Sequence, residues 1–300
     1  MPGLPDRGAV RCGPDTIGNV TAASSSPRAR FGRPIAAGLV VAGLLFLAYL
    51  FLVVAPQAGT FGFDAYAYWT VSMPDPYSIP VGALGAFNYS PAFAQVADWF
   101  GSVDWWVFLY LWTWLLIGSV IWIAGSPAWV AIAFAIPFVA LELYHGNIDI
   151  LLAVAIVLGF RHPWTWSFVL LTKPSAGVGL LWFAVRGEWR TLGIALGATV
   201  LIAGVSFVLA PQAWFDWFDL LLGNVGSTPL SPHIPIPLWV RLPAAVALVV
   251  WGARTDRRWT VVVSSMLALP VLWFAAPAML VGVIPELRVR SRGQTVAAGA

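Results

Sequence analysis

The sequence predicts an all-α polytopic integral membrane protein, and its composition, its apolar segments and its arginine placement are the observations that predict this. Of its 300 residues, 60% are hydrophobic and only 10% are charged, whereas soluble domains carry about 25% charged residues. The mean hydropathy is +0.82. About ten apolar segments follow one another, with arginines near their ends, as expected of spans joined by short loops. The net charge of +3 therefore reflects topology and does not indicate nucleic-acid binding.

The two ends of the chain are predicted to lie outside the membrane. Residues 1–34 are rich in Gly, Pro, Ser and Arg and lack apolar periodicity, which is typical of a disordered tail. Residues 35–55 are long enough for a first span, and no clear cleavage site follows, so an uncleaved helix is favoured over a signal sequence. We expect a cytoplasmic tail at 1–34, a transmembrane domain at 35–287 and a cytoplasmic tail at 288–300.

The later apolar segments vary in length, and several are short. They cover residues 104–124, 127–144, 148–160, 163–172, 175–185, 191–210, 236–252, 259–270 and 271–285. Lys173-Pro174 separates the segments at 163–172 and 175–185. A helix break is expected there, because proline disrupts a helix interior. We expect this pair to be two half-length helices that line a cavity enclosed by protein or filled with water.

An even number of crossings places both termini in the cytoplasm, together with Arg161 and the arginine-rich turns at 186–190 and 254–258. Most acidic and histidine side chains not explained by topology then fall outside. They are Asp64, Asp75, Glu142, Asp149, Asp216, Asp219, His145 and His233. A one-sided polar site favours an enzyme or receptor that faces the exterior over a channel, which needs polar residues through its depth. No internal repeat is visible, which weakens an inverted-repeat transporter.

Asp64 is the candidate catalytic residue, and it lies among aromatic residues at 61–69 that include Tyr66. A carboxylate with few water contacts has a raised pKa and can serve as a general base, while aromatic faces suit sugar rings. The alternative is an interfacial aromatic belt with a helix-capping aspartate. Tyr89 lies in the Asn-Tyr-Ser-Pro motif at 88–91, which opens a predicted amphipathic helix on the outer surface.

The turn at 144–149 contains three further candidates for substrate binding. His145 could contact an anionic ligand, and Asn147 and Asp149 could hydrogen-bond hydroxyl groups. Turn chemistry around Gly146 explains the same residues without a ligand, and helix packing could hold Asp149.

Lys173, the single lysine, and Arg241 are cations on the predicted outer side, and either could bind a phosphate. For Lys173 the alternative is a structural partner such as Glu142 or Asp149, and for Arg241 it is snorkelling to lipid headgroups. His233, in the same outer region, completes the substrate-binding candidates.

Other classes of site lack their sequence signatures. Cys12 is the only cysteine, so neither an intrachain disulfide nor a cysteine metal cluster is expected. Walker, dinucleotide-binding and Gly-x-Ser-x-Gly motifs are missing, as are His-Glu-x-x-His and carboxylate pairs at metal spacing. We therefore expect no metal and no cofactor.

The order of the motifs resembles that of glycosyltransferase family 87, the polyprenyl-phosphate-dependent mannosyltransferases of the GT-C class of membrane enzymes. Asp64 follows the first span, and Asn-Tyr-Ser-Pro at 88–91 precedes the next. Gly-Asn-Ile-Asp at 146–149 then leads into an apolar run, and Lys-Pro at 173–174 precedes the arginine-bounded turn at 186–190. Each motif is short, so their order carries the resemblance.

The resemblance spans about residues 35–225 and implies roles for individual residues. Asp64 matches the family's first-loop acid, Tyr89 and Pro91 match its Tyr-x-Pro, and Lys173-Pro174 matches its Lys-Pro. The turn at 146–149 is similar to the family's Gly-Gln-x-Asn, although Asn147 stands where Gln is usual and Asp149 where Asn is usual.

The resemblance implies a GT-C-like fold and transfer of a hexose, expected to be mannose, from a polyprenyl-phosphate donor to a glycolipid or cell-envelope glycan. The reaction is expected outside the cytoplasm, with inversion, because no second carboxylate is placed as a nucleophile. Membrane lipids are the other expected partners. A transporter or flippase of a lipid-linked anion remains an alternative, as does an inactive scaffold.

Overall fold

The computed structural model describes residues 27–73, 75–224 and 233–289. Most of each predicted tail, residues 1–26 and 290–300, lies outside the described residues. The chain forms two units, residues 1–38 and 39–300. The described part of the first unit is helical, and the site lies wholly within the second.

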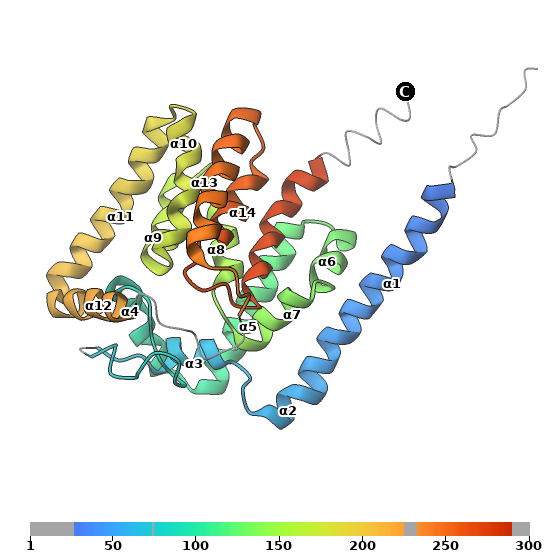
Figure 1. Ribbon diagram of the computed structural model, residues 1–300. Helices are drawn as coiled ribbons and strands as arrows, with labels where there is room; N and C mark the ends of the chain where they lie inside the picture. The colour runs from blue at the N-terminus through green and yellow to red at the C-terminus, as the bar shows by residue number, and fades with distance from the viewer. Residues whose placement is uncertain (1–26, 74, 225–232, 290–300) are drawn as a thin grey trace, which may run out of the picture. The chain divides into compact units, whose positions relative to one another are not determined.

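The architecture is all-helical across the described residues, as predicted, and the one isolated β-bridge there joins His233 and Trp273. Figure 1 shows the helices. Their bounds are α1 Pro27–Tyr49, η1 Leu50–Val54, α2 Ala55–Ala58, α3 Phe63–Thr70, α4 Pro91–Ala97, η2 Asp98–Ser102, α5 Trp105–Ala124, α6 Pro127–Phe134, α7 Pro137–His145, α8 Asp149–Gly159, η3 Pro163–Thr165, α9 Trp166–Thr172, η4 Pro174–Leu180, α10 Leu181–Val185, α11 Trp189–Leu209, α12 Pro211–Gly223, α13 Leu238–Thr255, α14 Trp259–Leu267 and η5 Ala276–Val283. The chain remains α-helical from 284 to 289.

Long apolar helices provide candidate membrane spans. Among the described residues, 4 stretches qualify by length and composition: Ala36–Ala58, Trp105–Ala124, Trp189–Leu209 and Leu238–Thr255. The bent pair α6 and α7, which turns by 73°, brings the number to 5 if it is one span. The predicted count of about ten is not confirmed, because several of the other apolar helices are too short to cross alone.

Prolines account for the breaks that shorten the helices. The predicted apolar run at 127–144 divides at Pro137, which begins α7, since proline is favoured in a first turn and disrupts a helix interior. The break expected at Lys173-Pro174 is present: α9 ends at Thr172, and η4 begins at Pro174.

Helix α8 lies between two apolar cores. Ile150 and Ala153 pack with α3, α4 and α5, whereas Leu152 and Ile156 pack with α9, α13 and α14. All four side chains are fully buried. Because α8 is fixed on both sides, its first residue, Asp149, has a defined position at the edge of both cores.

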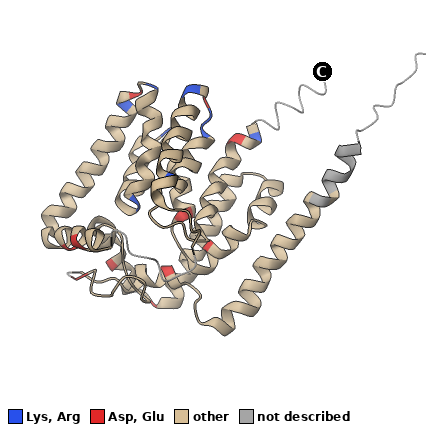
Figure 2. Ribbon diagram, in the orientation of Figure 1, with Lys and Arg blue, Asp and Glu red and all other residues tan. Residues whose placement is uncertain are grey.

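Helix α11 is far more exposed than α8, and its exposed side chains are apolar, including Val200 and Val208 at 70% and 80% exposure. This surface suits contact with lipid. Helix α11 contacts α12 and α4, and α12 also contacts α4. Among the residues whose side chains the structure describes, Figure 2 shows most Lys and Arg near the ends of helices that meet the turns at 186–190 and 254–258.

Candidate active site

Asp64 lies in the first turn of α3, which begins after Gly62 (φ 74°). The Gly62 N–H donates to the Tyr144 carbonyl at 2.8 Å and so fixes the start of α3 against α7. Tyr68 follows Asp64 by one helical turn and lies on the same face. Asp64 is half-buried, and Tyr68 is fully buried.

The turn between α7 and α8 brings Asn147 to α3. The Asn147 Oδ1 accepts the Ile148 N–H at 2.6 Å and the Tyr68 hydroxyl at 3.3 Å. Its Nδ2 is then available to donate, and the Asn147 side chain hydrogen-bonds Asp64. The Gly146 carbonyl accepts the Trp112 Nε1–H at 2.7 Å, which anchors the turn to α5.

Two buried acids organise the start of α8 and hold Lys173. The Glu142 Oε1 accepts the N–H groups of Asp149 and Ile150 at 2.6 and 3.2 Å and thereby caps the helix. The Asp149 Oδ1 pairs with the Lys173 Nζ at 2.5 Å. The Asp149 side chain is fully buried, and that of Lys173 is 13% exposed. The proposed structural partner of Lys173 is therefore present.

Tyr89 joins the same group from the segment before α4. Its hydroxyl lies 3.0 Å from that of Tyr68, and the next residue, Ser90, donates its N–H to the Leu171 carbonyl at 3.3 Å. Lys173 and Asp149 both act electrostatically on Tyr89 and on Asp64. We call this group the Asp64 cluster: Asp64, Tyr68, Tyr89, Glu142, Asn147, Asp149 and Lys173.

The Asp64 carboxyl has the protonation behaviour of a general base. Burial raises its pKa to about 7, because the charged form loses hydration. The Lys173 charge opposes this increase, the Asp149 charge adds to it, and the Asn147 hydrogen bond lowers the pKa. Near neutral pH the carboxyl can therefore both accept and release a proton.

Three predicted binding residues have contacts elsewhere. The Tyr66 ring packs against Trp69 and Trp105 at centroid distances of 5.6 and 5.2 Å, on the face of α3 opposite Asp64. His145 contacts the Tyr144 ring at 5.2 Å. His233 pairs with Trp273 in the β-bridge, and their rings are 6.3 Å apart.

Arg241 is a fourth predicted residue, and backbone carbonyls surround its guanidinium. The Nε donates to Ile236 at 2.6 Å, and one terminal nitrogen donates to both Leu267 and Leu269 at 2.7 Å. The other terminal nitrogen donates to Pro270 at 3.0 Å. These bonds use four of the five N–H donors of an arginine, and Arg241 is only 4% exposed. The geometry indicates a structural clamp on the chain after α14 and indicates neither snorkelling nor phosphate binding.

Tyr68 is not among the residues that the sequence predicts for the site, although its spacing from Asp64 places both on one helical face. The sequence predicts Glu142 on the outer polar face and as a possible partner of Lys173, whereas its role as a cap depends on the turn geometry. Within the described residues, no group of three or more His, Cys, Asp or Glu side chains is placed to hold a metal ion.

The family model of glycosyltransferase family 87 matches residues 87–298. The match includes Tyr89, Asn147, Asp149 and Lys173, and it begins after Asp64. Neither a curated protein nor a solved structure matches the chain. Because the family match covers most of the sequence, the chain belongs to glycosyltransferase family 87, a family of membrane glycosyltransferases.

Proposed function

We propose that the protein transfers a hexose, specifically mannose, from a polyprenyl-phosphate donor to a glycolipid or cell-envelope glycan on the extracytoplasmic face of the membrane. The observation that carries this proposal is the Asp64 cluster. It combines a carboxyl whose pKa is near 7 with a lysine held by a buried ion pair. Family membership supports transfer chemistry over the transporter. Sugar transfer by purified protein separates an active enzyme from an inactive scaffold, which would belong to the same family.

Asp64 is the proposed general base. The acceptor hydroxyl oxygen attacks the anomeric carbon, the bond from that carbon to the phosphate oxygen breaks, and the hydroxyl proton passes to Asp64. The polyprenyl phosphate leaves with the bonding electrons. The hydrogen bond from Asn147 and the packing of α3 against α7 orient the carboxyl before substrate binds.

The surroundings of the other two acids support inversion of the anomeric centre. Glu142 uses one oxygen to cap α8, and Asp149 uses one oxygen to hold Lys173. Both side chains are fully buried. This leaves Asp64 as the one cluster carboxyl proposed to meet substrate, which favours direct displacement over a glycosyl-enzyme intermediate.

Lys173 is proposed to bind the donor phosphate. An ammonium has three N–H donors, and one of them is used by Asp149. Because the ion pair as a whole is neutral, we expect recognition to rest on the two remaining N–H groups more than on net positive charge. The partial exposure of Lys173 leaves these groups accessible.

The test is transfer of labelled mannose by purified protein from polyprenyl-phosphate mannose to a membrane glycolipid extract. Asp64→Asn should reduce transfer by about 100-fold or more while preserving shape. Asp75→Asn is the matched control, because Asp75 is exposed and lies outside the cluster. Near-normal transfer by Asp64→Asn would remove Asp64 from the role of base, and use of a nucleotide sugar alone would exclude the proposed donor.

A further inference from the structure

The side chains of Tyr68 and Tyr89 form a hydrogen-bonded chain that ends at Asn147, and neither tyrosine has a part in the function proposed above. The two hydroxyl oxygens lie 3.0 Å apart, and the Tyr68 hydroxyl lies 3.3 Å from the Asn147 Oδ1. A tyrosine has one hydroxyl proton. The direction in which each proton is donated therefore decides what the free end of the chain, Tyr89, can offer to a substrate.

The backbone of Ile148 fixes the direction of this chain. Its N–H group can only donate, so the Asn147 side-chain atom that lies 2.6 Å from it is the carbonyl oxygen, Oδ1. Because Oδ1 can only accept, Tyr68 donates its proton to it. The Tyr68 oxygen then accepts the proton of Tyr89, since the opposite direction would set two oxygen lone pairs against each other. The Tyr89 oxygen keeps only the capacity to accept.

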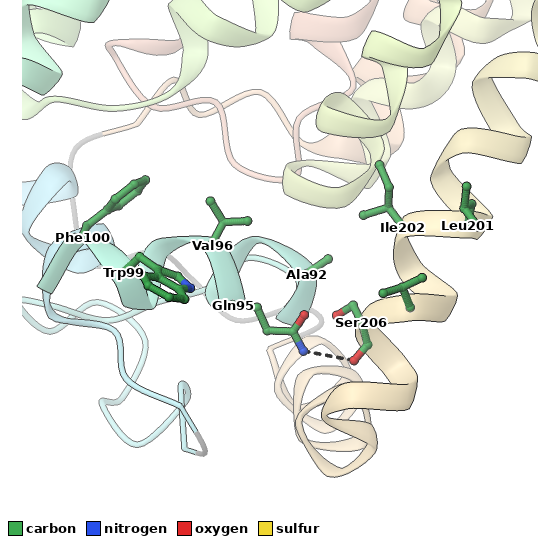
Figure 3. A pocket seen from close by; sticks show the side chains of 9 residues that line it. Ala92, Gln95, Val96, Trp99, Phe100, Leu201, Ile202 and Ser206 are labelled. Atoms are coloured by element: carbon green, nitrogen blue, oxygen red, sulfur yellow. Dashed lines mark hydrogen bonds between the residues drawn. The ribbon is translucent and has the colours of Figure 1, made fainter. Parts of the chain in front are cut away.

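Packing holds Tyr89 in its place just before α4. The Tyr89 ring packs against Phe93 at a centroid distance of 5.5 Å, and the Tyr89 carbonyl accepts the Tyr77 hydroxyl at 2.8 Å. Helix α4 is itself tied to α11, where the Gln95 Nε2 donates to the Ser206 carbonyl at 3.1 Å (Figure 3). The direction of the Tyr89 hydroxyl is therefore set by the fold before any substrate binds.

Tyr89 is the partly exposed end of the chain, whereas Tyr68 is fully buried. Lys173 and Asp64 are the charged residues that act most strongly on the Tyr89 hydroxyl, so it lies near both the proposed phosphate site and the proposed base. In the proposed reaction the transferred sugar lies between these two residues, because its anomeric carbon carries the phosphate and is attacked by the hydroxyl that Asp64 deprotonates. The sugar ring is then the part of the donor that meets Tyr89.

A sugar hydroxyl can donate a proton, whereas the oxygens of a phosphodiester can only accept. We propose that Tyr89 accepts a hydrogen bond from a ring hydroxyl of the transferred sugar, and that Tyr68 imposes this direction by taking up the Tyr89 proton. The inference rests on the proposed function, since a phosphate at Lys173 brings the sugar to this position. A hydroxyl of the acceptor has the same chemistry and is the other source to be tested.

Donors in which one ring hydroxyl at a time is replaced by hydrogen or by fluorine test the direction of the bond. Fluorine can accept a weak hydrogen bond and cannot donate one. At the hydroxyl that meets Tyr89, both replacements should weaken donor binding to the unchanged protein by about tenfold. Tyr89→Phe should bind the hydroxyl, deoxy and fluoro donors with similar affinity. A fluoro donor that binds the unchanged protein clearly better than the deoxy donor would show that Tyr89 donates and would overturn the inference.

Tyr68→Phe tests the part of the inference that concerns Tyr68. Without the Tyr68 oxygen, the Tyr89 proton is free to turn toward the sugar, so the fluoro donor should now bind better than the deoxy donor. Tyr144→Phe is the matched control, because it removes a buried tyrosine hydroxyl that bonds Thr60 at 2.7 Å, outside the chain. It should leave the ratio of the two affinities unchanged. Equal losses for all donors in Tyr68→Phe would indicate a purely structural role and would overturn this assignment.

The readouts separate failure of this contact from failure of the function, because affinities are measured by calorimetry without turnover. Equal losses for every donor in Tyr89→Phe would mean that Tyr89 only supports its neighbours, and would overturn the contact while leaving transfer intact. A loss seen only when acceptor hydroxyls are replaced would assign the bond to the acceptor and would also overturn the inference. The expected pattern of donor affinities in a protein that transfers no mannose would contradict the proposed transfer and retain the contact.

Discussion

The ion pair of Lys173 and Asp149 combines a partly exposed cation with a fully buried carboxylate. Asp149 is fully buried, whereas Lys173 retains 13% exposure. A largely buried ammonium without a partner is costly, so Asp149 makes the presence of Lys173 tolerable and also fixes its direction. The same contact therefore supports both folding and the proposed binding of phosphate.

The dual role of Lys173 predicts that stability and donor binding can be separated. Lys173→Met should lower donor affinity and also destabilise the fold by roughly 3–5 kcal/mol, because Asp149 remains buried without its partner. Adding Asp149→Asn should recover much of the stability and none of the affinity. Lys173→Arg should retain part of both. Thermal unfolding and donor binding, measured on the same preparations, check this. Recovery of donor affinity in the double variant would contradict the phosphate assignment.

The raised pKa of Asp64 predicts a pH dependence. Below its pKa of about 7 the carboxyl is protonated and cannot accept the acceptor's proton, so kcat/KM should fall tenfold per unit of decreasing pH. Above it, kcat/KM should reach a plateau. Rates measured from about pH 5 to 9 check this. The residual rate of Asp64→Asn should not show the fall, or acid limb, below about pH 7. A persistent limb in this variant would assign the titration to another group.

The carbonyl contacts of Arg241 predict a loss of stability on substitution. Arg241→Met leaves four carbonyls without their donors and should cost roughly 3 kcal/mol or more. The folded fraction should keep its donor affinity. Arg254→Met, which alters an exposed arginine at the other end of α13, should change stability by no more than about 0.5 kcal/mol. Normal stability with lost donor affinity in Arg241→Met would instead support phosphate binding.

At the scale of residues, placement on the outer face and the family resemblance predicted one polar site. It included Asp64, Tyr89, Asn147, Asp149 and Lys173, together with Tyr66, His145, Arg241 and His233. Tyr68 carries no such signal, since an aromatic residue in an apolar helix is ordinary. The contacts of Arg241 could not be predicted from the sequence either. Its partners are backbone carbonyls, and their direction depends on how the chain turns after α14.

At the scale of helices, the close approach of α3 to the α7–α8 turn requires a glycine. Gly146 has φ 69°, and a Cβ there would lie 2.7 Å from the Ala65 Cβ. The positive φ and the close approach to Ala65 both disfavour any residue with a side chain at position 146. The turn and α3 can therefore approach closely enough for Asn147 to reach Asp64.

Gly146→Ala should consequently disturb the position of α3. We expect a loss of about 1–3 kcal/mol in stability and a larger proportional loss in kcat than in donor affinity, since Asp64 moves relative to Asn147 while Lys173 stays with Asp149. Gly118→Ala is the control, because its Cβ would meet nothing within 4 Å in helix α5. The prediction fails if the two variants are equally active and equally stable.

Breaks between helices were partly predictable from proline. Lys173-Pro174 stood out because a charge and a proline coincided in an apolar run. Pro137 also disfavours a continuous helix. The apolar run around it has the length of one span, however, so hydropathy alone favoured a single helix at 127–144. The 73° bend shows that proline position was the better guide there.

At the scale of the whole chain, composition identified a membrane protein but could not fix the number of crossings. Short apolar helices such as α8 are buried between other helices, so their hydropathy reflects packing against protein as well as contact with lipid. Arginine placement is a second criterion, since arginines gather in the loops that stay in the cytoplasm.

Arginine placement gives the last prediction, an orientation with both termini in the cytoplasm and the Asp64 cluster outside. In a Cys12→Ser background, Ser78→Cys should react with a membrane-impermeant maleimide in intact cells, whereas Thr255→Cys should react only after permeabilisation. Both positions are exposed, so accessibility depends on the side of the membrane and not on burial. Permeabilised cells, in which both cysteines should react, provide the control. The reverse pattern would place Asp64 on the cytoplasmic side and would contradict the proposed extracytoplasmic transfer.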